Sequence, residues 1–149
     1  MAADRSYIAE NDRERRRLEA LVGKFDDAAL GRTMPDGWTV AGVLAHLAFW
    51  DQRIVTFIEL LKRGAKVPAE DPIDVEWINA AAKPTQLALP PGRAATLAVE
   101  TARAIDQAVA TLSDELLAKN AAAGGPINLR RAEHRREHLD EIEQALAKG

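Results

Sequence analysis

The three histidines are the residues whose type and spacing could do chemistry. His134 and His138 lie four residues apart near the C-terminus, and His46 lies far upstream. On a helix, side chains at positions i and i+4 project from the same face, so both imidazoles can reach one ion. A third nitrogen from another helix would leave positions open for water or substrate, which is typical of catalytic metal sites. We therefore predict a divalent-metal site at His46, His134 and His138.

Simpler interpretations of the histidines exist. Two exposed histidines on a charged C-terminal helix are common, and a single histidine at the edge of a core is more often hydrogen-bonded than metal-bound. All three, however, fall toward a border of the apolar face of their predicted helices. That compatible placement favours the metal site.

A long helix must position His46. Thr39 is a suitable N-cap because its hydroxyl can accept from the first turn, and Gly64 suits the C-terminal end because glycine readily becomes left-handed. At 100° per residue, His46 falls about 80° from the centre of the apolar stripe, at the edge of the buried face. The stripe consists of two columns that repeat every seven residues: Val40, Leu47, Ile54 and Leu61, beside Val43, Trp50 and Phe57.

The rest of the chain also follows a helical pattern without strand-like alternation. We predict long helices over residues 6–24, 39–63, 92–112 and 127–147, a short helix over 73–83, and a further turn over 114–117 capped by Ser113. The connections are predicted at 25–38, 65–72, from Lys83-Pro84 to Pro90-Pro91-Gly92, and 121–126. Four long helices predict an all-α four-helix bundle that forms one domain over residues 1–149.

Composition limits the class of protein. Among 149 residues, 47% are apolar and 29% charged, which indicates a folded globular chain, and the absence of cysteine excludes disulfides and thiolate ligands. No signal peptide or membrane-length apolar run is present, so we expect a cytoplasmic protein without a membrane partner. A net charge of −3 gives no general attraction to nucleic acid. The basic residues Arg13 and 15–17 alternate with acids, as on a solvated helix face.

Two segments resemble a known family. Gly37-Trp38-Thr39-Val40-x5-His46-Leu47-x2-Trp50-Asp51, and the closing run from His134 to Ile142, look like the two histidine-bearing segments of the DinB/YfiT-like superfamily. A weaker similarity covers Ile73 to Asn79. The resemblance extends over most of the chain.

This resemblance implies an up-down-down-up four-helix bundle, commonly a homodimer. It also implies a divalent ion, with nickel and zinc as the main candidates, held by His46, His134 and His138. Characterised relatives include thiol S-transferases that use low-molecular-weight thiols, a mycothiol-dependent maleylpyruvate isomerase and proposed hydrolases. The isomerase has a C-terminal domain that this chain lacks, which weakens the case for that substrate.

Other polar residues near the histidines have open roles. Asp51 faces the bundle, and because an unpaired buried carboxylate is costly, we expect an arginine partner; a general base is the alternative. Arg131 and Arg135 could hold an anionic substrate or be solvated. We expect Trp50 to lie in the core, although it could instead form the wall of a pocket. We expect Asn79 to form a hydrogen bond in helix packing, although it could instead contact the site.

Three hypotheses for function follow. The first is an enzyme that acts on a small molecule with a metal-activated water or thiol, either a transferase or a hydrolase of detoxification or stress response. The second is a metal-dependent binding or stress protein without turnover. The third is a structural or dimerisation module whose histidines never meet. Metal content separates the third from the others, and turnover with a thiol and an electrophile separates the first from the second.

Overall fold

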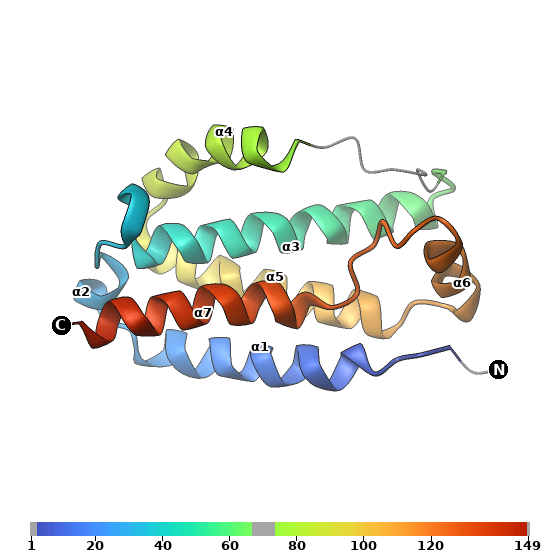
Figure 1. Ribbon diagram of the computed structural model, residues 1–149, viewed down its shortest axis with the longest axis horizontal. Coiled ribbons are helices and arrows are strands. Elements are labelled where there is room, and N and C mark those ends of the chain that lie inside the picture. The colour runs from blue at the N-terminus through green and yellow to red at the C-terminus, as the bar shows by residue number, and fades with distance from the viewer. Residues whose placement is uncertain (1–2, 67–73, 149) are drawn as a thin grey trace.

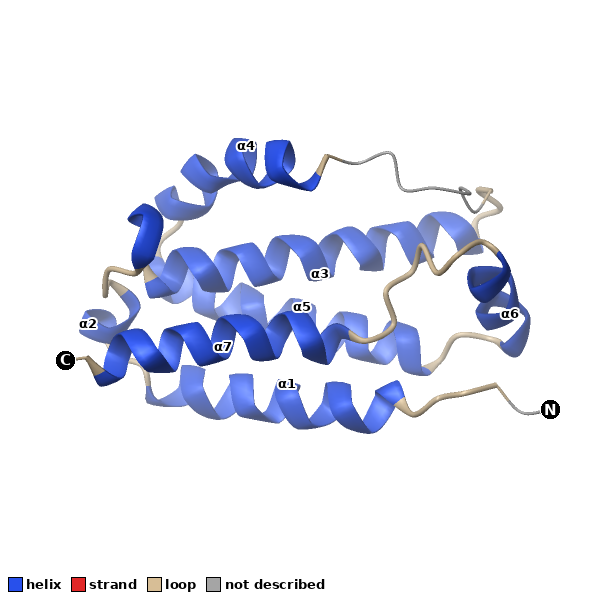
Figure 2. Cartoon of the chain, in the orientation of Figure 1, coloured by secondary structure: helices blue, strands red, loops and turns tan. Residues whose placement is uncertain are grey.

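Helices account for all of the regular structure in the described part of the chain. The computed structural model describes residues 3–66 and 74–148, and within these ranges no strand is present apart from one isolated bridge between Thr33 and Thr39. Figure 2 shows helices joined by loops. The helices are α1 (Tyr7–Lys24), α2 (Asp27–Leu30), α3 (Val40–Lys62), α4 (Val75–Ala88), α5 (Pro91–Ala110), α6 (Asp114–Ala122) and α7 (Arg131–Ala147), with a 3₁₀ turn at Pro35–Gly37. The all-α prediction is confirmed.

The four longest helices lie alongside one another. In Figure 1, α1, α3, α5 and α7 run along the length of the molecule, α4 lies outside α3, and α6 closes one end. The helix pairs in contact include α3 with α5, α1 with α7, α1 with α5, and α3 with α7. The predicted adjacency of the two histidine-bearing helices is therefore confirmed. None of the described helices combines the length and the apolar character required to cross a bilayer.

Helix α3 begins and packs largely as its sequence predicts. The Thr39 hydroxyl accepts from the Gly42 amide at 3.0 Å, and Gly64 adopts a left-handed φ of 98° directly after the helix. The first apolar column is buried along its whole length: Val40, Leu47, Ile54 and Leu61. In the second column, Trp50 and Phe57 are only half-buried. Trp50 and Phe57 each line a different hollow on the surface of α3. Besides its core face, the helix therefore borders two possible binding sites.

Helix α4 differs from its prediction. It continues through Pro84 to Ala88. The prediction of an irregular stretch from Lys83 onward is therefore wrong for residues 83–88, which are helical. A proline inside a helix costs about 3 kcal/mol locally, and tertiary packing offsets it here. Leu87 lies over Gly42 of α3, where a Cβ atom would come within 2.7 Å of its Cδ2. The predicted loop over 65–72 falls mostly outside the described residues.

The start of the last helix was also predicted too early. Helix α7 begins at Arg131, and two asparagine side chains hold the backbone just before it. The Asn120 side chain accepts from the Ile127 amide at 2.8 Å and donates to the Ile127 carbonyl at 3.0 Å. The Asn11 side chain donates to the Leu129 carbonyl and accepts from the Ala132 amide. Helix α6, capped by Ser113 as predicted, is longer than the single turn expected.

Candidate metal centre

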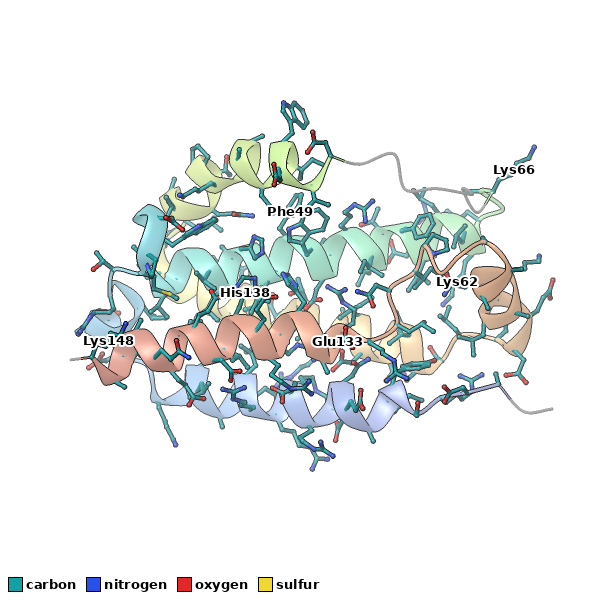
Figure 3. The ribbon with its side chains drawn as sticks, viewed as in Figure 1. Phe49, Lys62, Lys66, Glu133, His138 and Lys148 are labelled. Atoms are coloured by element: carbon teal, nitrogen blue, oxygen red, sulfur yellow. The ribbon has the colours of Figure 1, made fainter. Side chains whose placement is uncertain are left out.

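The three histidines meet between α3 and α7. His46 projects from α3, and His134 and His138 project from adjacent turns of α7; Figure 3 shows His138 between the two helices. The Nε2 atom of His134 lies 3.2 Å from Nε2 of His46 and 3.2 Å from Nε2 of His138. Each residue offers one ring nitrogen, and these three nitrogens all lie within 4.8 Å of one another. Sequence reasoning thus selected three residues that the tertiary structure brings together.

The donor set fits a divalent cation. Two nitrogens bound to one tetrahedral ion at 2.0–2.1 Å are separated by roughly 3.3 Å, which is close to the 3.2 Å spacing of two of the three nitrogen pairs. Hydrogen bonding alone satisfies the cluster poorly, because the single Nε2 position of His134 faces two other ring nitrogens at once. A cation instead accepts all three lone pairs together. Imidazole nitrogen is a common ligand of zinc and nickel, so this group could hold such an ion.

Burial keeps two of the rings in the neutral form that binds metals. Desolvation by burial, with a smaller electrostatic contribution from His138, lowers the pKa of His46 to about 4. Desolvation also lowers the pKa of His134 to about 3, with contributions from His138, His46, Arg131 and Arg135. Protons therefore compete for these two nitrogens only at a lower pH than the ordinary range of histidine.

These shifts predict a pH-dependent stability of the metal-free protein. Below pH 6.5 the unfolded chain binds protons at His46 and His134 that the folded chain does not, so acid favours unfolding. From pH 7 to pH 5, we expect the free energy of unfolding to fall by roughly 1–2 kcal/mol more in the wild type than in His134→Gln. Urea denaturation at both pH values measures this difference. Identical pH dependence in the two proteins would contradict the lowered pKa of His134.

One carboxylate orients a candidate ligand. The Nδ1 atom of His138 lies 3.2 Å from Oε2 of Glu141, one turn further along α7. If this nitrogen carries the proton and donates it to the carboxylate, the Nε2 lone pair faces the other histidines. The buried Nδ1 of His46, in contrast, has no hydrogen-bond partner among the described residues. The Trp38 ring packs edge-on against His46, with centroids 5.8 Å apart.

We predict that Glu141→Gln weakens metal affinity about 10-fold, because loss of an outer carboxylate typically costs 10–100-fold. Competition against a chelator of known affinity measures the change. Glu137→Gln is the matched control, since Glu137 lines the same cavity and loses the same charge without a recorded hydrogen bond to a histidine among the described residues. An equal loss in both variants would indicate a general charge effect and contradict the positioning role.

The histidines open into a cavity of about 550 Å³ between α3, α4 and α7. Trp50 forms part of its wall, and its indole N–H donates to Oδ1 of Asn79 at 2.8 Å. The expectation that Trp50 is a core residue is therefore wrong, because Trp50 is only half-buried and lines the cavity. Asn79 both joins α4 to α3 and lines the cavity. The described lining residues are Trp38, Val43, His46, Trp50, Val75, Asn79, Asn128, Arg131, His134, Glu137, His138 and Glu141.

A buried ion-pair network lies beneath the cavity. Arg131 donates from Nε and an Nη atom to the same Asp51 oxygen at 3.0 and 2.9 Å, which confirms the expected arginine partner. Arg135 binds both oxygens of Asp106 at 3.1 Å, and Arg15 reaches Asp106 from α1 at 3.0 Å. Both Arg131 and Arg135 are buried, so the interpretation that they are solvated is wrong.

Sequence reasoning missed two parts of this arrangement. Glu141 follows His138 by three residues, a helical spacing that signals a neighbouring side chain. Arg135 pairs with Asp106 and thereby joins α7 to α5. Because the two residues are far apart in the sequence, no local pattern predicts this pair.

A comparison with protein families agrees with this geometry. The family model described as the DinB superfamily matches residues 10–142, a range that contains all three histidines and both helices that carry them. No curated protein and no solved structure matches the chain.

Proposed function

The chain belongs to the DinB superfamily, and on this premise we propose that it binds one divalent ion through His46, His134 and His138. We further propose that it acts as a metal-dependent transferase or hydrolase, with a low-molecular-weight thiol as cosubstrate in the transferase case. The observation that carries the proposal is the convergence of three ring nitrogens from two helices beside an open cavity. Nickel and zinc are the candidate ions.

The cavity residues have complementary tasks in this proposal. A bound ion would act as a Lewis acid that lowers the pKa of a coordinated water or thiol. Trp38 and Trp50 border the cavity and exclude water from part of it, while the Asn79 amide and the Arg131 guanidinium offer polar contacts for a small-molecule substrate. Asp51 accepts two hydrogen bonds from Arg131, so the guanidinium keeps a fixed position in the wall of the cavity.

The assembly and arrangement are also part of the proposal. We infer that α1, α3, α5 and α7 form the up-down-down-up four-helix bundle of the family and that the protein acts in the cytoplasm as a homodimer, without nucleic-acid or membrane partners. Support for the dimer comes from the resemblance to the family, in which homodimers are common. Sedimentation at micromolar concentration tests this assembly.

Elemental analysis of protein purified without a histidine tag or added metal tests the metal. We expect close to one nickel or zinc ion per chain. Assays of the loaded protein with a thiol and an electrophile then test turnover. Metal without turnover would favour a metal-dependent binding or stress protein, and failure to take up any divalent ion would contradict the proposal.

A further inference from the structure

A second hollow lies on a different face of α3 from the histidines. It has a volume of about 660 Å³, in the range of small-molecule sites, and is bordered by α3, the last turns of α4 and the start of α5. Figure 3 shows Phe49 on the side of α3 that faces α4. We call this hollow the Gln86 groove. Its described lining residues are Ala45, Ala48, Phe49, Gln52, Arg53, Thr56, Phe57, Leu60, Thr85, Gln86, Leu89, Leu97 and Thr101.

One polar side chain in this groove is unusual. Gln86 is only 6% exposed, and neither its Nε2 nor its Oε1 atom has a hydrogen-bond partner among the described residues. Other polar side chains of the lining do have partners: Gln52 donates to the Thr56 hydroxyl at 3.1 Å, and the Thr101 hydroxyl donates to the Leu97 carbonyl at 2.8 Å. The Gln86 amide is thus left unsatisfied in an otherwise apolar wall.

An unsatisfied buried amide is destabilising, and an apolar residue of similar size would fit the same position at lower cost. Both polar ends of this amide are therefore available to a partner that arrives from outside the folded chain. The amide has one acceptor and two donor hydrogens, so its complement must both donate and accept. The groove is apolar and, among its described lining residues, only Arg53 is charged. A neutral ligand suits such a wall, since a charge would lose its hydration there.

We propose that the Gln86 groove binds a neutral small molecule with an apolar body and a carboxamide group. The carboxamide pairs with the Gln86 amide, donating to Oε1 and accepting from Nε2, and the apolar body lies along α3 toward Leu60. This site is separate from the histidine cavity, because the described linings of the two hollows share no residue. Its occupation consequently does not depend on the metal.

The test uses octanamide as the probe and methyl octanoate as its matched ligand, because the ester keeps the chain and the carbonyl but lacks a donor. Calorimetric titration of the full chain is expected to show about 10-fold tighter binding of octanamide than of the ester. Gln86→Leu should remove this preference while it still binds the ester. Gln52→Leu, the same substitution at an exposed groove residue, should keep the preference.

A second measurement works without a variant. In nitrogen-edited NMR of the wild type, octanamide is expected to shift the Gln86 side-chain amide resonances, whether or not the metal is bound. Equal affinity of the wild type for both probes would overturn the proposal. So would an absence of binding together with a concentration-dependent dimer that Leu60→Glu dissociates, because the groove would then be covered by a second copy of the chain.

Discussion

His134→Ala is expected to abolish stoichiometric binding of the divalent ion, with affinity reduced by at least about 100-fold. Of the three rings, His134 has the central position, since its Nε2 lies 3.2 Å from Nε2 of each of the other two. Its removal leaves two nitrogens on different helices and too few protein ligands for a three-histidine site. Competition with a chelator measures the affinity, and a chelator should lower the melting temperature of the wild type but not of the variant.

Glu133→Ala is the matched control for this experiment. Glu133 is the preceding residue of α7 and is exposed, so its replacement should leave metal affinity within about 2-fold of the wild type. Circular dichroism should show unchanged helicity in both variants, because the buried apolar columns hold the helices together. Wild-type stoichiometry and affinity in His134→Ala, or full retention by both His46→Ala and His138→Ala, would rule out the proposed site.

Arg135→Met is expected to destabilise the metal-free protein by about 3–5 kcal/mol, the usual effect of removing one partner from a buried ion pair. Arg135 is 1% exposed and donates to both oxygens of Asp106 and to the Asn11 carbonyl. Methionine fills much of the volume but leaves Asp106 with Arg15 alone. Urea denaturation of metal-free protein measures the change, which corresponds to a melting temperature lower by roughly 10 °C.

Arg136→Met is the control for this second prediction. Arg136 is the next residue of α7 and pairs with Glu14 at 3.2 Å, but its side chain is 42% exposed, and the buried Glu14 carboxylate keeps Arg17 as a second partner at 3.3 Å. Its loss should cost less than about 1 kcal/mol. If Asp106→Asn is combined with Arg135→Met, the double variant should be more stable than the sum of the two single effects predicts, since the carboxylate that has lost Arg135 is then gone. Equal stability of Arg135→Met and Arg136→Met would show that the buried network contributes no net stability.

The two experiments distinguish the metal site from the buried ion-pair network that lies next to it. Metal affinity depends on the histidines, whereas stability in the absence of metal depends on the network formed by Asp51, Arg131, Arg135 and Asp106. Arg131 belongs to the network and also lines the cavity, so damage to the network should reach the site through this residue, and the charge of Arg135 also acts on His134.

The amino-acid sequence by itself determined the helical class, the core face of α3 and the identity of the candidate ligands. These features depend on short-range properties: the seven-residue repeat from Val40 to Leu61, the Thr39 cap, and the one-turn spacing of His134 and His138. Such patterns are readable because a helix relates residues three and four apart in a fixed way. Local chemistry also implied a partner for Asp51, since a buried carboxylate needs one.

Only the tertiary structure decided which residues pair with one another and where two of the helices begin or end. The choice of Arg131 for Asp51 and Asp106 for Arg135, the continuation of α4 past Pro84, and the late start of α7 at Arg131 all depend on contacts between distant segments. The unsatisfied amide of Gln86 is invisible in the sequence for the same reason. A glutamine on a helix is ordinary until the fold buries its amide in the wall of a groove, without a hydrogen-bond partner among the described residues.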